Sequence, residues 1–276
     1  MEFTFRQVDV FASAPFLGNP LAVVVGADGL SDEQMARIAN WTNLSETTFL
    51  LNPVHPQADY KVRIFTPQRE LPFAGHPTLG SAYVWWSLGG RPKQSVIMQE
   101  CGVGLVAVRE QTGKLAFAAP PRRRVGPVSQ EDLNAALDAL NLQPQDSLDA
   151  QWVDNGPGWM AIRMRSREDV LAVRPNWLKL KGKMIGLVGP WEKDADVQFE
   201  LRAFAGQVLE GEDPVTGSLN ASVAQWLIET GIAPQRYVAS QGTALGRAGR
   251  VRVEQEGGEI WVGGDVIPCI AGTISL

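Results

Sequence analysis

The segment GHPTLGSA at residues 75–82, preceded by RIF at residues 63–65, has a second copy in the chain: EDPVTGSL at residues 212–219, preceded by RAF at residues 202–204. Each copy contains Arg-x-Phe, a glycine-containing loop, the pattern x-Pro-x-x-Gly-Ser and then a helical pattern. Aligning His76 with Asp213 gives an offset of 213 − 76 = 137, about half of the 276 residues. Internal similarity of this kind predicts a duplicated α/β unit.

The similarity extends on both sides of these segments. Downstream, residues 103–108 and 115–117 alternate around Thr112-Gly113, and residues 251–253 and 260–262 alternate around Gly257-Gly258. Each pair predicts a β-hairpin. Upstream, residues 21–25 and 159–164 have strand-like sequences that follow turn residues.

Each half also contains one strongly apolar helical pattern. Leu79, Ala82, Tyr83 and Trp86 have helical spacing, and the pattern in the second half is formed by Leu219, Val223, Trp226 and Leu227. A helix that is apolar nearly all round is buried. The sequence therefore predicts an α+β protein with two similar domains, each a barrel-like, mostly antiparallel sheet around a central helix. We expect domains at residues 1–122 and 125–265, with a last strand at 266–276 that could pack back on the first.

Charge and composition narrow the partners and the location. A net charge of −5 argues against nucleic acid or an anionic membrane as the main partner. The basic run Arg122-Arg123-Arg124 lies in a proline-rich connector and is interpreted as a solvated linker. No signal-peptide pattern is visible and the apolar runs are strand-sized, so we expect a cytoplasmic protein. Cys101 and Cys269 are expected to be reduced thiols.

The two matching loops end where the predicted central helices begin. Unpaired N–H groups and the positive end of the helix dipole meet there, which predicts an anion site in each half. Pro77 and Pro214 suit a first helical turn, and Ser81 and Ser218 are expected in that turn. The alternative is that Asp213 and Ser218 only cap their helix.

Glu46 and His76 are the other candidates for chemistry. Glu46 enters an apolar strand, where it is either a solvated edge charge or a general acid or base. His76 at a helix N-terminus should have a lowered pKa and stay neutral, unless its role is structural. The chain has two histidines and no clustered cysteines, so no metal-ligand spacing exists.

Three other motifs are weaker indications of a functional site. The sequence GVGLVA at 102–107 matches a dinucleotide fingerprint, but alternates as a strand afterwards instead of opening a helix. Ser218 could serve a hydrolase, yet it lacks the G-x-S-x-G elbow. The glycine-rich segment 241–249 could close over a substrate or be a connector.

Several motifs together resemble PhzF-like (phenazine-biosynthesis) proteins. They are VDVF (8–11), FLGNPLAV (16–23), NLSETTF (43–49), RIFTP (63–67), ELPFAGHPTLG (70–80), GEDPVTGS (211–218), and QG (241–242) with GR (246–247). The resemblance covers the whole chain. It implies the diaminopimelate epimerase-like fold, with one site between the two domains, and a homodimer.

The resemblance also implies an activity and its residues. The phenazine enzyme of this family isomerises a dihydro-hydroxyanthranilate by moving a proton, with a glutamate as shuttle. Glu46 stands in the matching motif, and His76 and Asp213 match assisting polar residues. The substrate-binding positions implied by the matching motifs are Ser45, Gly75, Gly217, Ser218 and Gln241.

The related epimerases and racemases of the wider superfamily use two cysteines at the N-termini of the two helices. Cys101 and Cys269 are at neither position. We therefore expect a one-carboxylate proton shift on a small carboxylate-bearing substrate, without metal or other cofactor. The alternative is a non-catalytic small-molecule-binding protein with the same fold. A serine hydrolase that uses Ser218 is a third, weaker option.

Overall fold

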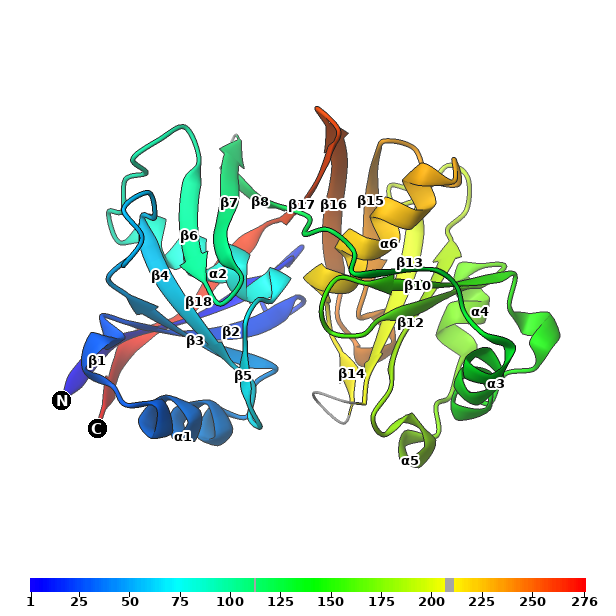
Figure 1. Cartoon of the computed structure of the whole chain (residues 1–276), viewed down its shortest axis with the longest axis horizontal. Helices are drawn as coiled ribbons and strands as arrows, with labels where there is room; N and C mark the ends of the chain where they lie inside the picture. The colour runs from blue at the N-terminus through cyan, green and yellow to red at the C-terminus, as the bar shows by residue number, and fades with distance from the viewer. Residues whose placement is uncertain (112, 207–210) are drawn as a thin grey trace. The chain divides into compact units, whose positions relative to one another are not determined.

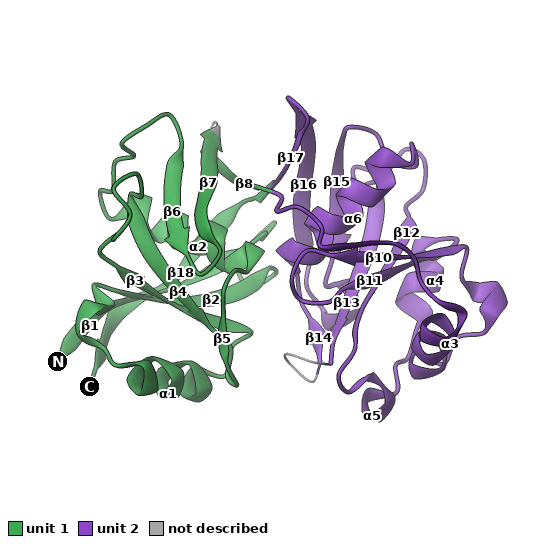
Figure 2. Cartoon of the chain, in the orientation of Figure 1, with its two compact units in different colours: residues 1–118, 263–276 green, residues 119–262 purple. Residues whose placement is uncertain are grey.

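The computed structural model describes residues 1–111, 113–206 and 211–276, and these form two compact units. Unit 1 consists of residues 1–118 and 263–276, and unit 2 consists of residues 119–262 (Figure 2). The chain therefore leaves unit 1 once and returns to it at the end. Both termini lie in unit 1, where the Met1 ammonium group donates to the Leu276 carbonyl over 2.5 Å (Figure 1).

Unit 1 is a mostly antiparallel sheet around one helix. Its elements are β1 (Glu2–Val10), β2 (Asn19–Val25), η1 (Ala27–Gly29), α1 (Asp32–Thr42), β3 (Glu46–Leu51), β4 (Tyr60–Phe65), β5 (Glu70–Leu71), α2 (Gly75–Ser87), β6 (Ile97–Cys101), β7 (Gly104–Gln111), β8 (Lys114–Ala118) and β18 (Val266–Ser275). The strand order is β18–β1–β2–β3–β4–β6–β7–β8, with only the β2–β3 and β4–β6 pairs parallel. Helix α2 packs against all eight of these strands.

Unit 2 repeats this arrangement. Its elements are β9 (Arg124–Pro127), α3 (Gln130–Ala139), η2 (Pro144–Asp146), β10 (Asp149–Asp154), β11 (Met160–Arg163), α4 (Arg167–Ala172), α5 (Trp177–Leu180), β12 (Met184–Pro190), β13 (Phe199–Ala205), β14 (Glu212–Asp213), α6 (Gly217–Glu229), β15 (Arg236–Gln241), η3 (Thr243–Leu245), β16 (Gly249–Glu256) and β17 (Glu259–Gly264), whose last two residues belong to unit 1. The order β9–β10–β11–β12–β13–β15–β16 has two parallel pairs, β11–β12 and β13–β15. The central helix is α6 (Figure 1). The predicted fold class is thus confirmed.

The internal duplication has a different register from the one that the motifs predicted. Glu70 and Glu212 both pair with the Phe of their Arg-x-Phe segment. The central helices begin at Gly75 and Gly217. The differences 212 − 70 and 217 − 75 are both 142, so the alignment of His76 with Asp213 at an offset of 137 was wrong. The structural counterpart of His76 is Ser218, because each is the second residue of its helix.

The reason for this shift lies in the loop that precedes α6. The Thr216 N–H donates to the Gln241 side chain over 3.0 Å, and Thr216 has an extended backbone with φ −107° and ψ 102°. The helix therefore starts at Gly217, five residues later than the offset of 137 predicts, and Pro214 lies before it instead of in its first turn. Ser81 is the seventh residue of α2, so it also lies outside the first turn. There its hydroxyl donates to Thr48 Oγ1 over 2.9 Å.

The outer helices α1, α3 and α4 each begin at a capping serine. Ser31 and Gln34 form a capping box at α1, and Ser129 and Ser166 cap α3 and α4. Helix α1 covers a core cluster that includes Val24 and Phe49. In unit 2, a core cluster that includes Leu137, Val170 and Leu180 lies under α3, α4 and α5.

In the basic run of the connector, Arg123 and Arg124 are exposed, as predicted for a solvated linker, and Arg122 is half-buried. The Arg122 guanidinium donates to Glu229, and the Arg124 guanidinium lies 3.3 Å from the centroid of the Trp152 ring. Arg124 also starts β9, which pairs with β10. Two arginines of this solvated run therefore also contact other residues of unit 2.

Several local predictions can be compared with the structure. Residues 104–111 and 114–118 are paired strands, although Thr112 of the predicted turn lies outside the described residues. The 102–107 segment joins β6 to β7, so it opens no helix. Cys101 and Cys269 are free thiols, in β6 and β18. In the described part of the chain, no helix is both long and apolar enough to cross a membrane.

Candidate functional site

Glu46 and His76 lie together in unit 1. Glu46 is the first residue of β3 and His76 is the second residue of α2. His76 Nδ1 is 3.4 Å from Glu46 Oε2, and the two residues are 3% and 8% exposed. The interpretation of Glu46 as a solvated edge charge is therefore wrong, and the structure brings these two predicted residues into one buried pair.

The residues before Glu46 and the pairing of its strand place Glu46 beside His76. Asn43 ends α1 in the left-handed conformation, with φ 53°, and Ser45 then leads into β3 as a half-buried residue. Strand β3 pairs with β2 in parallel, with Leu21 opposite Glu46. Both β2 and β3 pack against α2, which carries His76.

His76 is held as a neutral imidazole. Burial lowers its pKa from 6.5 to about 3, and a hydrogen bond with the backbone of Pro20 opposes part of that shift. The predicted direction is therefore confirmed, but the main cause is desolvation and not the helix dipole. Near pH 7 the contact with Glu46 is a polar contact of an uncharged ring, and not an ion pair.

The two ring nitrogens of His76 have different surroundings. Nδ1 faces Glu46 Oε2 and the amide nitrogen of Asn19, each at 3.4 Å. Nε2 is buried and makes no hydrogen bond with any described residue. A neutral imidazole has one donor and one acceptor nitrogen. Nε2 is therefore the ring atom left to exchange a hydrogen bond or a proton with a ligand.

Sequence reasoning missed Asn19 as a member of this site. Asn19 is fully buried and begins β2, directly after a tight loop. In that loop the Gly18 N–H donates to Asp9 Oδ2 over 2.9 Å. Phe11 and Phe16 have φ of 59° and 70°, values that side chains rarely adopt. The signal that points to Asn19 is the GNP segment at residues 18–20, within the FLGNPLAV motif.

The predicted residues of unit 2 form a second buried network. The Thr216 hydroxyl donates to Asp213 Oδ2 over 2.6 Å. The same hydroxyl accepts from Gln241 Nε2 over 3.0 Å, so its proton is directed to the carboxylate. Gln241 Nε2 also donates to the Asp213 carbonyl, while its Oε1 accepts from Thr216 N and Asn220 Nδ2.

Gln241 therefore has all of its amide positions filled by the chain itself. It is fully buried, with two donated and two accepted hydrogen bonds. The same position in unit 1 is Gln99, which donates to Thr78 Oγ1 over 3.0 Å and accepts from the Tyr60 hydroxyl over 2.9 Å. The geometry favours a role in holding the loop 213–216 in place. The prediction that Gln241 itself contacts a substrate stays a prediction.

Ser218 is held from two sides at the start of α6. Trp159 Nε1 donates to Ser218 Oγ over 3.1 Å, and Asn155 Nδ2 donates to the Ser218 carbonyl over 2.9 Å. An indole N–H is only a donor, so it cannot take the serine proton as a base would. The contact leaves the Ser218 hydroxyl proton oriented away from Trp159, which suits donation to a ligand.

Both central helices begin without a side-chain cap. The N-cap of α2 is Ala74, and the N-cap of α6 is Thr216, whose hydroxyl is used by Asp213. The alternative that Asp213 or Ser218 caps α6 is therefore wrong. Gly75 and Gly217 are the first helical residues, and neither adds a side chain over these N–H groups. Each helix start can therefore attract an anion such as a carboxylate.

The described residues contain no group of three or more His, Cys, Asp or Glu side chains arranged to hold a metal ion. Unit 1 offers a buried carboxylate beside a neutral imidazole, and unit 2 offers a buried carboxylate bonded to the Thr216 hydroxyl. Such sets suit proton transfer and the binding of small polar molecules.

Comparisons with known proteins point to one family. Residues 8–267 match the family model described as phenazine biosynthesis-like protein. The chain is 35% identical to antisense-enhancing sequence 1 of Schizosaccharomyces pombe, with 98% of each chain covered. It is 33% identical to the trans-2,3-dihydro-3-hydroxyanthranilate isomerase of Pseudomonas aeruginosa, over 91% of this chain and 89% of that one.

A solved structure agrees with the fold. The PhzF-family protein of Enterococcus faecalis superposes with a TM-score of 0.82 at 25% identity, with 100% of each chain covered. The strand order of the two units and the two central helices are thus an arrangement that this structure shares.

Proposed function

This chain belongs to the phenazine biosynthesis-like family and is an isomerase, and we propose that it moves a proton within a small carboxylate-bearing substrate without a cofactor. The observation that carries the proposal is the buried pair of Glu46 and His76, 3.4 Å apart. A carboxylate sheltered from water beside a neutral imidazole can take and return a proton without losing it to solvent. Of the functions left open by the sequence, the comparisons favour isomerase over non-catalytic binding protein.

In this mechanism Glu46 acts as general base and then as general acid. Its carboxylate removes a proton from a substrate carbon, and the electron pair of the broken C–H bond delocalises into the conjugated system of the substrate. The protonated Glu46 then returns the proton to another carbon of that system. Atoms and charge balance within the substrate, so no oxidant or reductant is needed.

The other residues are proposed to position and polarise the substrate. His76 would exchange a hydrogen bond through Nε2, which makes none within the described chain. The N–H groups at Gly75 or at Gly217 and Ser218 would bind a substrate carboxylate, with the Ser218 hydroxyl as a further donor. Asp213 and Ser45 are proposed to contact substrate amino or hydroxyl groups.

The substrate is tested by NMR in D₂O with the purified wild-type protein. The panel contains the dihydro-hydroxyanthranilate named for the Pseudomonas aeruginosa relative, together with small amino and hydroxy carboxylates. Product formation is followed alongside deuterium incorporation, because a proton returned by Glu46 can escape exchange. We expect conversion of at least one compound, unchanged after treatment with EDTA. Conversion that is lost with EDTA and restored by a metal would contradict cofactor independence.

We further propose that the protein works in the cytoplasm as a homodimer, with no nucleic acid or membrane partner. Support comes from the acidic net charge of −5 and from the family resemblance. Size-exclusion chromatography with light scattering measures the mass directly. A monomeric mass at micromolar concentration would overturn the dimer.

A further inference from the structure

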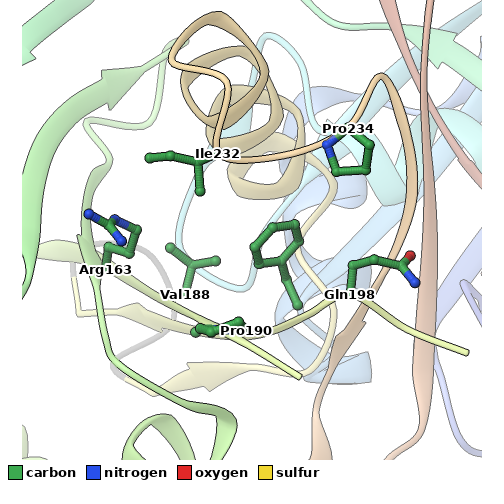
Figure 3. Close-up of a pocket in the computed structure, with 8 residues that line it drawn as sticks. Arg163, Val188, Pro190, Gln198, Ile232 and Pro234 are labelled. Atoms are coloured by element: carbon green, nitrogen blue, oxygen red, sulfur yellow. The ribbon is translucent and has the colours of Figure 1, made fainter. Parts of the chain in front are cut away.

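Unit 2 contains a cavity away from the residues discussed above. It has a volume of about 260 Å³ and lies among β11, β12, β13 and the loop after α6. Figure 3 shows Arg163 at one end of it, with Ile232 and Pro234 above and Val188 and Pro190 below. The volume is below the range of about 300–1,000 Å³ typical of drug-sized sites, so it suits a small ligand.

Arg163 is the charged group of this cavity, and it has no partner of its own. Its guanidinium makes no hydrogen bond or ion pair with any described residue, and its Nε is buried. Asp149 lies opposite Arg163 in the β10–β11 ladder but forms no ion pair with it in the described structure. Arg202 of the same unit shows the contrast, because Glu212 and two backbone carbonyls occupy its guanidinium.

An arginine with its donors unused is suited to a carboxylate. The planar guanidinium binds a carboxylate through two parallel hydrogen bonds, and such bonds to charged groups are strong where water is partly excluded. A buried donor without a partner costs free energy, so an incoming acceptor is favoured.

The rest of the cavity is mainly apolar. Val188, Phe199, Ile232 and the two prolines supply its walls. The polar group opposite Arg163 is Gln198, but its Oε1 accepts from Val238 N over 2.9 Å and its Nε2 donates to the Ala195 carbonyl. None of the described residues that line the cavity has a carboxylate side chain. Its chemistry therefore matches a monocarboxylate with a flat or compact apolar body.

The cavity is separate from the Ser218 cluster. Ser218 lies in the first turn of α6, while Ile232 and Pro234 follow the last residue of that helix, Glu229. A helix of 13 residues is about 20 Å long. A ligand in the cavity would therefore sit about one helix length from Ser218.

We propose that this cavity is a second, non-catalytic binding site for a small monocarboxylic acid, recognised by Arg163 through its carboxylate and by the apolar walls through its body. The inference does not rest on the proposed isomerase function. A ligand bound there joins β11, β12 and β13 to the loop after α6, so it should stabilise unit 2 against unfolding.

The test uses benzoate as the probe and benzamide as its neutral counterpart, with the full-length protein and isothermal titration calorimetry. We expect benzoate to bind at least tenfold more tightly than benzamide. Arg163→Gln should weaken benzoate binding at least tenfold, and Arg163→Lys should weaken it less. Arg165→Gln is the matched control, because Arg165 is exposed and bonds to the Gln145 carbonyl instead of facing the cavity.

Two further variants separate this site from the catalytic one. Val188→Phe fills the cavity while leaving Arg163 in place, and should also weaken benzoate binding at least tenfold. Ser218→Ala should leave it unchanged. Circular dichroism confirms that each variant is folded. Absence of benzoate binding at millimolar concentration, or binding that is lost in Ser218→Ala and kept in Arg163→Gln, would overturn the proposal.

Discussion

One hydroxyl group, that of Thr216, determines how Asp213 is held. It accepts from Gln241 and donates to Asp213 Oδ2 over 2.6 Å, and all three residues are buried. Because the glutamine amide is fixed by its other bonds, the hydroxyl can point its proton only at the carboxylate. Position 71, the counterpart of Asp213 in unit 1, is a leucine, so this relay is particular to unit 2.

Thr216→Val should therefore lower the stability of unit 2 and the activity more than Thr216→Ser does. Valine keeps the shape but removes the hydroxyl that donates to Asp213 Oδ2 and accepts from Gln241 Nε2, so two buried hydrogen bonds are lost at a cost of about 1–3 kcal/mol. We expect kcat/KM to fall at least tenfold in the valine variant and to stay within about threefold of wild type in the serine variant. Urea unfolding and steady-state kinetics measure the two effects. Equal behaviour of the two variants would show that the relay is unimportant.

His76 should make the stability depend on pH. Its pKa is about 3 in the folded protein and 6.5 in the unfolded chain, so the unfolded chain takes up a proton first as the pH falls. The free energy of unfolding should therefore fall between pH 6.5 and pH 3, by up to about 1.4 kcal/mol per pH unit from this residue.

His76→Gln removes this contribution and should give a shallower pH dependence in that window. Urea unfolding followed by tryptophan fluorescence, at several pH values, measures the difference. His55→Gln, in an exposed loop, is the control and should keep the wild-type slope. Identical slopes for wild type and His76→Gln would mean that the ring is not held neutral by burial.

At the scale of elements, the loop between β1 and β2 brings Asn19 to His76. It turns within residues 11–18, and Gly18 is the residue on which the turn depends. A Cβ atom at Gly18 would lie 2.3 Å from the Val10 carbonyl oxygen and 2.9 Å from Asp9 Oδ1. These contacts are too short, and the first is with backbone, so the loop would have to move.

Gly18→Ala should therefore destabilise the protein by about 1–3 kcal/mol and also lower activity, because Asn19 is displaced. Gly29→Ala is the matched control. Gly29 is exposed at the end of η1, and a Cβ atom there meets nothing within 4 Å. Thermal unfolding compares the two variants. A Gly18→Ala protein as stable as Gly29→Ala would show that the loop accommodates the added carbon.

Much of the element pattern could be predicted from the sequence, because it depends on local signals. The apolar spacing of Leu79 and Trp86 marks a buried helix, and Ser31 with Gln34 marks the start of α1. The register of the duplication could not be predicted in this way. It depends on Gln241, which lies 25 residues after Thr216 and yet delays the start of α6 by bonding to it.

The contacts within the candidate site also could not be predicted, because they join residues that are far apart in the sequence. Glu46 and His76 were predicted from motifs, but their pairing depends on packing of β3 and β2 against α2. Asn19 was missed because its contact with His76 spans 57 residues, and an asparagine after glycine is an ordinary turn signal. Arg163 was missed because an arginine in a strand gives no sign of lacking a partner.

For the whole molecule, the duplicated units share a topology but differ in chemistry. The second residue of the central helix is His76 in unit 1 and Ser218 in unit 2, and neither is a cysteine. The two cysteines lie in β6 and β18 instead. A pair of thiols at the helix starts is thus excluded by the sequence itself, which favours proton transfer by one carboxylate.

The most direct test of this account compares wild type, Glu46→Gln and Glu2→Gln for product formation and deuterium incorporation with the substrate found in the panel. Glutamine matches the shape of Glu46 but cannot carry the proton, whereas Glu2 is exposed at the start of β1. We predict that Glu46→Gln is folded, binds the substrate and loses at least a thousandfold in kcat, and that Glu2→Gln equals wild type. A folded Glu46→Gln protein with turnover near that of wild type would contradict the central role of Glu46.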